Sequence, residues 1–229
     1  MMNRLGTGLL LCAIACTPAR MQVAPDLAAA SEAMMVTDRS SWTGSLVDES
    51  FRFGPYRVTE VDRKWSTGSG WGVGAYATHS SVSGYSFVLE APVGKIAGRC
   101  GTEVDKSSVK LFGGEAYNIT ASLACACGPD ATGSRFVLRS DGHGLMAGAA
   151  MIGGAEVALR PINQMEGGYT AGQAFGYEAR GTEVVAGVEV VHPGRVWLAR
   201  SLVPPAAADM ACLAAGLLLY VPPDAHATP

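Results

Sequence analysis

Histidine and aspartate side chains are the residues of this chain whose types could support acid–base chemistry. His143 lies in the sequence DGHG at residues 141–144, and His192 precedes a Pro-Gly pair, so both occupy segments typical of hairpin turns. Asp141, His143 and His192 could exchange protons with a substrate only if the fold brought these turns together. The chain contains neither a G-x-S-x-G nor an H-E-x-x-H motif. We therefore expect no catalytic residues and keep an enzyme of unrecognised type as an alternative.

Cysteine side chains offer a second kind of chemistry, as a disulfide or as metal ligands. Cys125 and Cys127 are two residues apart, so in a strand both point to one face and do not readily bond each other. Cys100 closes the preceding strand-like segment, and we predict a Cys100–Cys125 disulfide, although Cys127 remains a possible partner. A metal site formed by these three cysteines is the alternative, but neither a nearby histidine nor a C-x-x-C pair accompanies them. We expect no metal or cofactor, and Cys212, in an apolar segment, is expected to be a free buried thiol.

A glycine-rich segment at residues 68–74, GSGWGVG, suggests a nucleotide-binding loop at first sight. It lacks the Lys-Ser/Thr pair of a phosphate-binding loop, and no helical pattern follows it to supply a helix N-terminus. We interpret it as a glycine-rich strand. Trp65 and Trp71 lie beside or within it, and they are our first guess for a ligand-binding site.

The overall composition excludes some classes of partner. Lys and Arg number 17 and Asp and Glu number 20, which gives a formal net charge of −3. Nucleic-acid binding requires clustered basic residues, and binding to anionic lipid through charge requires a polybasic run; the sequence has neither. Only 16% of the residues are charged and 29 are glycine, which indicates a well-buried chain rich in turns or crowded strands.

The N-terminus has the pattern of an export signal. Arg4 precedes an apolar segment, residues 5–15, and the small residues Ala13 and Ala15 stand directly before Cys16. This pattern resembles a bacterial lipoprotein signal. The resemblance implies removal of residues 1–15 and attachment of acyl chains, including palmitate, to the sulfur and the new amino group of Cys16. The membrane would then be a partner, reached through the lipidated cysteine.

The same residues leave two points of localisation open. Ala13 and Ala15 also satisfy the ordinary signal-peptidase rule, which would give the same cleavage but a soluble secreted protein. If the protein is lipidated, Thr17 after the cysteine favours the outer membrane by the sorting rule of the lipoprotein family. We expect a lipid-anchored protein of the cell envelope, facing the periplasm or the surface.

Behind the signal, the sequence predicts a tether and one domain. Residues 16–49 are rich in small residues and proline and form the expected tether, with a short helix around Asp26–Met35. The domain is expected at residues 50–223, followed by a tail at 224–229. An apolar helix is predicted from Ala206 to Tyr220, because proline pairs flank it on both sides. Since it is too short to cross a bilayer, we expect it to be buried within the domain.

Three similar hairpins precede this helix. Each reads as an aromatic residue, two residues and a charge, then a turn, an apolar pair and Ala-Gly; the hairpins start at Phe87, Phe136 and Tyr177. The recurrent glycine indicates a bend or a close approach of backbones. Repeated twisted hairpins predict a mainly β fold, an antiparallel barrel or strongly curved sheet around the apolar helix. A β-sandwich with a packed helix is the alternative.

Repeated hairpins followed by an apolar C-terminal helix resemble the tubby-like group, which includes the phospholipid scramblases and the LURP-one-related proteins. The closest stretch runs from Tyr177 to Tyr220. The resemblance implies a closed antiparallel barrel threaded by one C-terminal helix. No binding residues carry over, because the basic cluster with which tubby domains bind phosphoinositides is missing.

Together these patterns predict a non-catalytic lipoprotein of the cell envelope, a tethered binding or structural module whose partner the sequence does not name. A barrel that binds a lipid or another apolar ligand is the alternative from fold analogy. A secreted enzyme is the third possibility.

Overall fold

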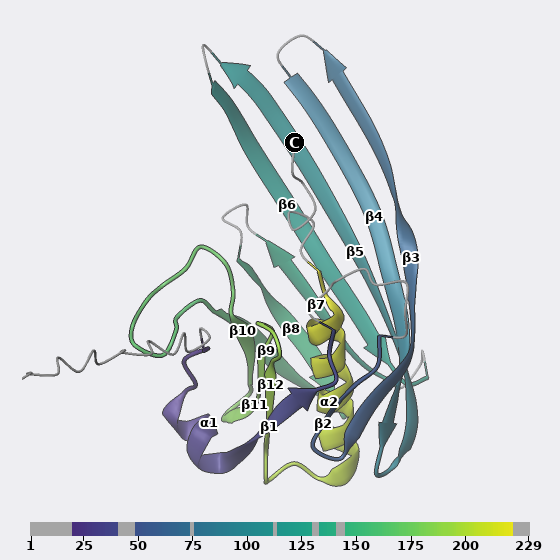
Figure 1. Ribbon diagram of the computed structural model, residues 1–229, viewed down its shortest axis with the longest axis vertical. Helices are drawn as coiled ribbons and strands as arrows, with labels where there is room; N and C mark the ends of the chain where they lie inside the picture. Colours follow the sequence, from purple (N-terminus) through teal and green to yellow (C-terminus); the bar gives the residue numbers. More distant parts are fainter. Residues whose placement is uncertain are drawn as a thin grey trace, which may run out of the picture.

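The strands form a closed antiparallel β-barrel around the C-terminal helix (Figure 1), and buried residues alternate with exposed residues along them. The structure is a computed structural model that describes residues 20–40, 49–73, 76–111, 114–129, 133–140 and 145–221. The mainly β prediction and the barrel are confirmed, and the alternative β-sandwich does not form. The strands are β1 Ser31–Thr37, β2 Phe51–Phe53, β3 Tyr56–Val73, β4 Tyr76–Ala91, β5 Gly94–Leu111, β6 Gly114–Cys127, β7 Ser134–Ser140, β8 Met146–Ile152, β9 Ala155–Ile162, β10 Gly176–Arg180, β11 Val184–Glu189 and β12 Arg195–Ala199.

The three predicted hairpins are the pairs β4–β5, β7–β8 and β10–β11. Their recurrent glycines mark close approaches. Gly98 lies directly opposite Phe87, and a Cβ at this glycine would overlap the phenyl ring. A Cβ at Gly148 would likewise overlap the carbonyl of Val137. Glycine therefore lets a neighbouring ring or backbone occupy the space that a side chain would fill.

The C-terminal helix, α2 Pro204–Leu219, fills the barrel interior. It begins two residues before and ends one residue before the predicted span, and Pro204 and Pro205 occupy its first turn. Nearly every residue from Ala208 to Leu219 is buried, because the barrel wall surrounds the helix on all sides. Neither of the described helices is long and apolar enough to span a membrane.

Two disulfides connect this core. Cys100 and Cys125 face each other on β5 and β6 and form one of them. Cys127 and Cys212 form the other, which ties β6 to α2. The expectation that Cys212 is a free thiol is therefore wrong, because threading α2 through the barrel brings this residue to the β6 wall. Among the described residues no group of His, Cys, Asp and Glu is placed to hold a metal ion.

The barrel begins nearer the N-terminus than the sequence predicted, at residue 31 and not at residue 50. Helix α1 Pro25–Ala30 is shorter than the helix expected over residues 26–35, and β1 follows it directly. β1 pairs with β12 on one side and with β2 on the other, which closes the barrel. The expected tether at residues 16–49 therefore contains a strand of the barrel. The expected tail at 224–229 lies outside the described residues.

Four strands continue far beyond the barrel. β3 to β6 contain 14 to 18 residues each, whereas the other strands contain 3 to 8. β2 pairs with β3 only at residues 56–58, and β7 pairs with β6 only at residues 122–127. Beyond these points β3 to β6 form a four-stranded sheet that rises above the barrel (Figure 1). We call residues 67–73, 76–82, 103–111 and 114–122 the strand extension. Its strands are about 23 to 30 Å long.

Candidate functional site

The strand extension carries a shallow polar hollow on one face. Its volume is about 370 Å³, and its lining residues are Ser69, Gly70, Thr78, His79, Ser80, Asp105, Lys106, Ser107, Asn118 and Thr120. Strand register explains the arrangement: Ser69, Ser80, Asp105 and Thr120 are direct neighbours across the four strands. Thr78, Ser107 and Asn118 form the next row.

Strand alternation places this hollow on the outside of the sheet. Cys100 on β5 and Cys125 on β6 point into the barrel, against Gly216 of α2. Asp105 and Thr120 are each an odd number of residues away on the same strands, so their side chains leave the opposite face. The hollow is thus separated from the filled interior by the sheet itself.

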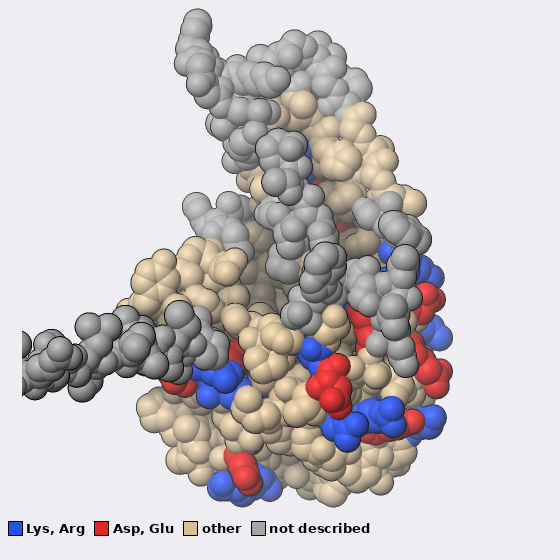
Figure 2. All heavy atoms as spheres, viewed as in Figure 1, with Lys and Arg blue, Asp and Glu red and all other residues tan. Residues whose placement is uncertain are grey.

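The hollow is lined mostly by hydrogen-bonding side chains, together with two residues of opposite charge, Asp105 and Lys106. Serine and threonine hydroxyls donate and accept, and the Asn118 amide does both. The carboxylate of Asp105 is the acidic member of the lining and Lys106 the basic one. The sequence contains no Lys, Arg, Asp or Glu between Trp65 and Leu89, so β3 and β4 contribute no formal charge to the extension. In the face that Figure 2 presents, Lys, Arg, Asp and Glu side chains gather on the barrel. Since the charges of Asp105 and Lys106 oppose each other, the hollow fits a neutral ligand with many hydroxyl or amide groups.

Sequence reasoning missed most residues of the hollow. The signal that could have revealed them is a polar pair two residues apart on each of three strands: Thr78 and Ser80, Asp105 and Ser107, Asn118 and Thr120. In a strand, that spacing places both members of a pair on one face.

The predicted ligand residues lie on the same extension or just below it. The backbone of Trp65 and Trp71 belongs to β3, and Trp71 is paired in register with Thr78, which lines the hollow. The side chains of both tryptophans lie outside the described part of the structure. Cys16, Asp141 and His143 also lie outside it. His192 is exposed between β11 and β12, and desolvation together with the charge of Arg39 lowers its pKa.

A pair of arginines at the end of α2 is the most cationic feature near the core, and it caps the helix. Arg39 donates to the carbonyls of Leu218 at 2.6 Å and Val190 at 3.0 Å, and Arg63 donates to the carbonyl of Leu219 at 3.0 Å. Burial and the charge of Arg63 lower the pKa of Arg39 to about 10, so it is still protonated at neutral pH. Leu218 and Leu219 end α2, so their carbonyls have no partner within the helix, and positive charge at a helix C-terminus is stabilising. The two guanidinium groups therefore serve the fold.

No family model, curated protein or solved structure matches the chain.

Proposed function

We propose that this protein is a non-catalytic, lipid-anchored component of the bacterial cell envelope that binds another envelope component through its strand extension. The observation that carries the proposal is the extension itself, a sheet of four strands that continues beyond an already closed barrel. Closure of the barrel and burial of α2 do not require these residues. Their outer face presents the polar hollow of about 370 Å³.

The anchoring half of the proposal rests on Cys16 and the lipoprotein-like signal before it. Acylation of Cys16 would attach the protein to a membrane, and the outer membrane is favoured by Thr17. Stable membrane attachment generally takes more than one acyl chain, which the lipoprotein type of modification supplies. A soluble secreted form is the alternative that the same residues allow.

We also propose that this protein belongs to the tubby-like group, and the support for this is the architecture of its fold. A closed antiparallel barrel around an apolar C-terminal helix is the arrangement that this resemblance implies, and it is the arrangement of this chain. The ligand chemistry differs, because the arginines nearest the helix end, Arg39 and Arg63, are bonded to backbone carbonyls. The proposed binding surface is therefore the extension.

The barrel interior has almost no free space, which favours a ligand site on the strand extension over a site inside the barrel. A hollow of about 10 Å³ lies between α2 and the strands, lined by residues such as Leu159, Tyr177 and Leu213, and it is at most the size of one water molecule. An apolar ligand would have to displace α2, which the Cys127–Cys212 disulfide holds to the wall. This observation argues against the alternative that the barrel binds a lipid or another apolar ligand.

The binding half can be tested by cosedimentation of the full-length protein with purified envelope polysaccharide and peptidoglycan of the bacterial host. The double variant Asn118→Ala/Thr120→Ala removes hydrogen-bonding groups from the hollow, and Thr37→Ala removes an exposed hydroxyl from the barrel as a matched control. Each lost bond is worth about 1 kcal/mol, so we expect about ten-fold or greater loss for the double variant. Unchanged binding in the double variant, or no binding of the wild type to either polymer, contradicts the proposal.

A further inference from the structure

The chain is fixed to the barrel from its first described residues. Met21 is fully buried; its backbone N–H donates to Oε1 of Glu189 at 2.7 Å. Its neighbours add two backbone bonds to the loop after β9: Gln22 donates to Gln164, and Glu166 donates to Arg20, each at 2.9 Å. The segment therefore lies as an added edge against the loop that joins β9 and β10.

Glu189 makes this attachment hard to release. Its side chain is fully buried, and Nε of Arg195 donates to Oε2 at 2.6 Å. Arg20 approaches the same oxygen at 3.5 Å. Detaching Met21 would leave Oε1 with only the longer bond from Nη2 of Arg195, at 3.3 Å, and weaker hydrogen bonding to a buried carboxylate is destabilising.

Apolar packing seals the same place. Met21, Leu27, Phe175 and Trp197 form a small buried cluster outside the barrel, separate from the main core around α2. The Arg195 guanidinium also stacks over the Trp197 ring at 4.9 Å. The N-terminal segment is thus held by hydrogen bonds, charge and buried apolar surface.

This attachment changes the reach of a lipid on Cys16. Only three residues lie between Cys16 and Arg20, and the four steps from one Cα atom to the next span at most about 14 Å. A flexible tether over the expected range 16–49 would instead have allowed a separation of about 30 Å. An acylated Cys16 therefore holds one corner of the barrel at the membrane surface.

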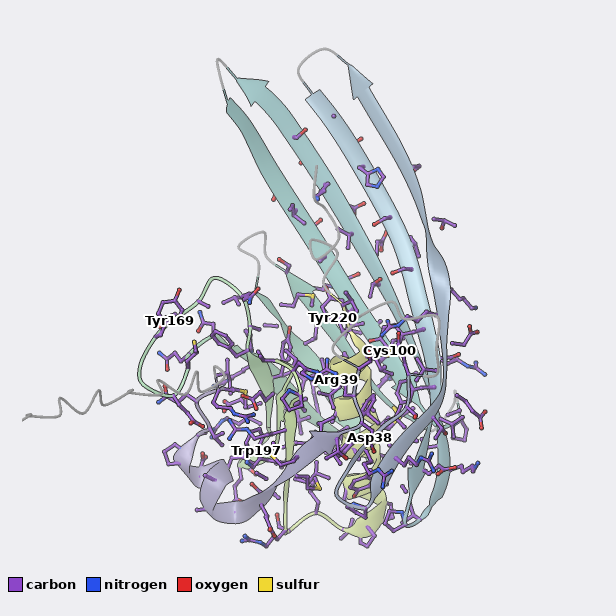
Figure 3. All side chains as sticks on the ribbon, viewed as in Figure 1. Asp38, Arg39, Cys100, Tyr169, Trp197 and Tyr220 are labelled. Carbon is purple, nitrogen blue, oxygen red and sulfur yellow. A yellow bond between two sulfur atoms is a disulfide. The ribbon has the colours of Figure 1, made fainter. Side chains whose placement is uncertain are left out.

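An exposed aromatic side chain lies at that corner. Tyr169 is 65% exposed, and its carbonyl accepts from Met165, which forms a bridge with Met21. Figure 3 shows Tyr169 on the loop that bulges from the same side of the barrel as α1. Tyrosine prefers the membrane–water interface, where its ring is in apolar surroundings and its hydroxyl is hydrated.

We propose that the corner formed by Arg20, Met21 and the β9–β10 loop docks on the lipid surface, with Tyr169 in the interfacial region. This inference rests on the proposed lipidation of Cys16. The strand extension rises from the other side of the barrel (Figure 1), so docking holds the polar hollow away from the lipid surface and toward a ligand in the surrounding compartment.

The test uses the full chain, purified from a host that acylates lipoproteins, with its mass measured before reconstitution into phosphatidylcholine vesicles. Tyr169→Trp reports on the docking corner, and Val82→Trp, at a residue 51% exposed on the extension, is the matched control. Brominated phosphatidylcholine quenches indole fluorescence on contact. The wild-type fluorescence is subtracted from that of each variant, and the difference is compared between brominated and ordinary vesicles.

We expect brominated lipid to lower the added fluorescence of Tyr169→Trp about two-fold and to leave that of Val82→Trp unchanged. An acylated protein in which both variants are quenched equally, or neither is, overturns the docking proposal and leaves the anchor intact. A mass without acyl chains overturns the proposed anchor itself, and the docking with it.

Discussion

Removal of the disulfide between the helix and the barrel wall is the most informative perturbation of the fold. Cys127 and Cys212 are separated by 85 residues, and Cys100 and Cys125 by 25. If a disulfide stabilises by restricting the unfolded chain, closing the longer loop contributes about 4.5 kcal/mol and the shorter about 3.5 kcal/mol. The helix–wall disulfide should therefore be the more stabilising by about 1 kcal/mol.

The comparison uses two matched double variants, Cys127→Ala/Cys212→Ala and Cys100→Ala/Cys125→Ala. Urea unfolding of each gives the free energy of unfolding relative to the wild type. Each disulfide contacts or includes α2, so the loss of buried sulfur is similar in the two variants. The difference between them then reports mainly on loop length.

A loss below about 2 kcal/mol for Cys127→Ala/Cys212→Ala would refute the loop-closure reasoning. The same conclusion follows if Cys100→Ala/Cys125→Ala is the more destabilised of the two. The first result would mean that packing, with little help from the disulfide, holds α2 in the barrel. The second would mean that loop length does not decide which disulfide stabilises more.

Three further predictions concern the packing and capping of α2 and one buried tyrosine. Gly216→Ala places a Cβ 3.0 Å from a sulfur of the disulfide between β5 and β6, and thermal unfolding should show a loss of about 1 kcal/mol that disappears without that disulfide. Arg39→Ala removes the donor to the carbonyls of Leu218 in α2 and of Val190 and Pro193 outside it, so urea unfolding should show a loss of about 2–4 kcal/mol. Arg52→Ala, which breaks an exposed ion pair, should cost less than about 1 kcal/mol. Burial raises the pKa of Tyr177 to about 12. The folded state keeps this proton while the unfolded state loses it from about pH 10, so stability should fall between about pH 10 and 12. Tyrosinate absorbance measured on alkaline unfolding should show that Tyr177→Phe ionises one tyrosine fewer than the wild type.

Local patterns were sufficient for the parts of the fold that neighbouring residues determine. The hairpins beginning at Phe87, Phe136 and Tyr177 combine strand patterns with turn residues, and each forms. Proline pairs located α2 to within two residues at either end. Cys100 and Cys125 bond because they lie on consecutive strands in direct register.

Long-range contacts decided the rest. Residues 31–37 form β1 only because β12 and β2 lie on either side, and no signal within the segment distinguishes it from a tether. Cys212 meets Cys127 because α2 enters the barrel. Burial of Glu189 depends on a backbone N–H that comes from 168 residues earlier in the chain.

The sequence predicted only part of the candidate site. The glycine-rich segment at residues 68–74 was correctly interpreted as strand over the part that the structure describes, and Trp71 pairs in register with a residue of the hollow. The hollow itself depends on the alignment of four long strands. Hydroxyl residues such as Ser80, Ser107 and Thr120 are ordinary on any exposed strand until that register is known.

The most direct test of the account is the state of the N-terminus in the exported protein. Mass spectrometry and detergent-phase partitioning are applied to the wild type and to Cys16→Ala. We expect a mature wild-type chain that begins at Cys16, carries acyl chains and enters the detergent phase, whereas Cys16→Ala stays in the aqueous phase. A wild-type chain that lacks acyl mass and partitions with the aqueous phase would contradict a lipid-anchored envelope protein.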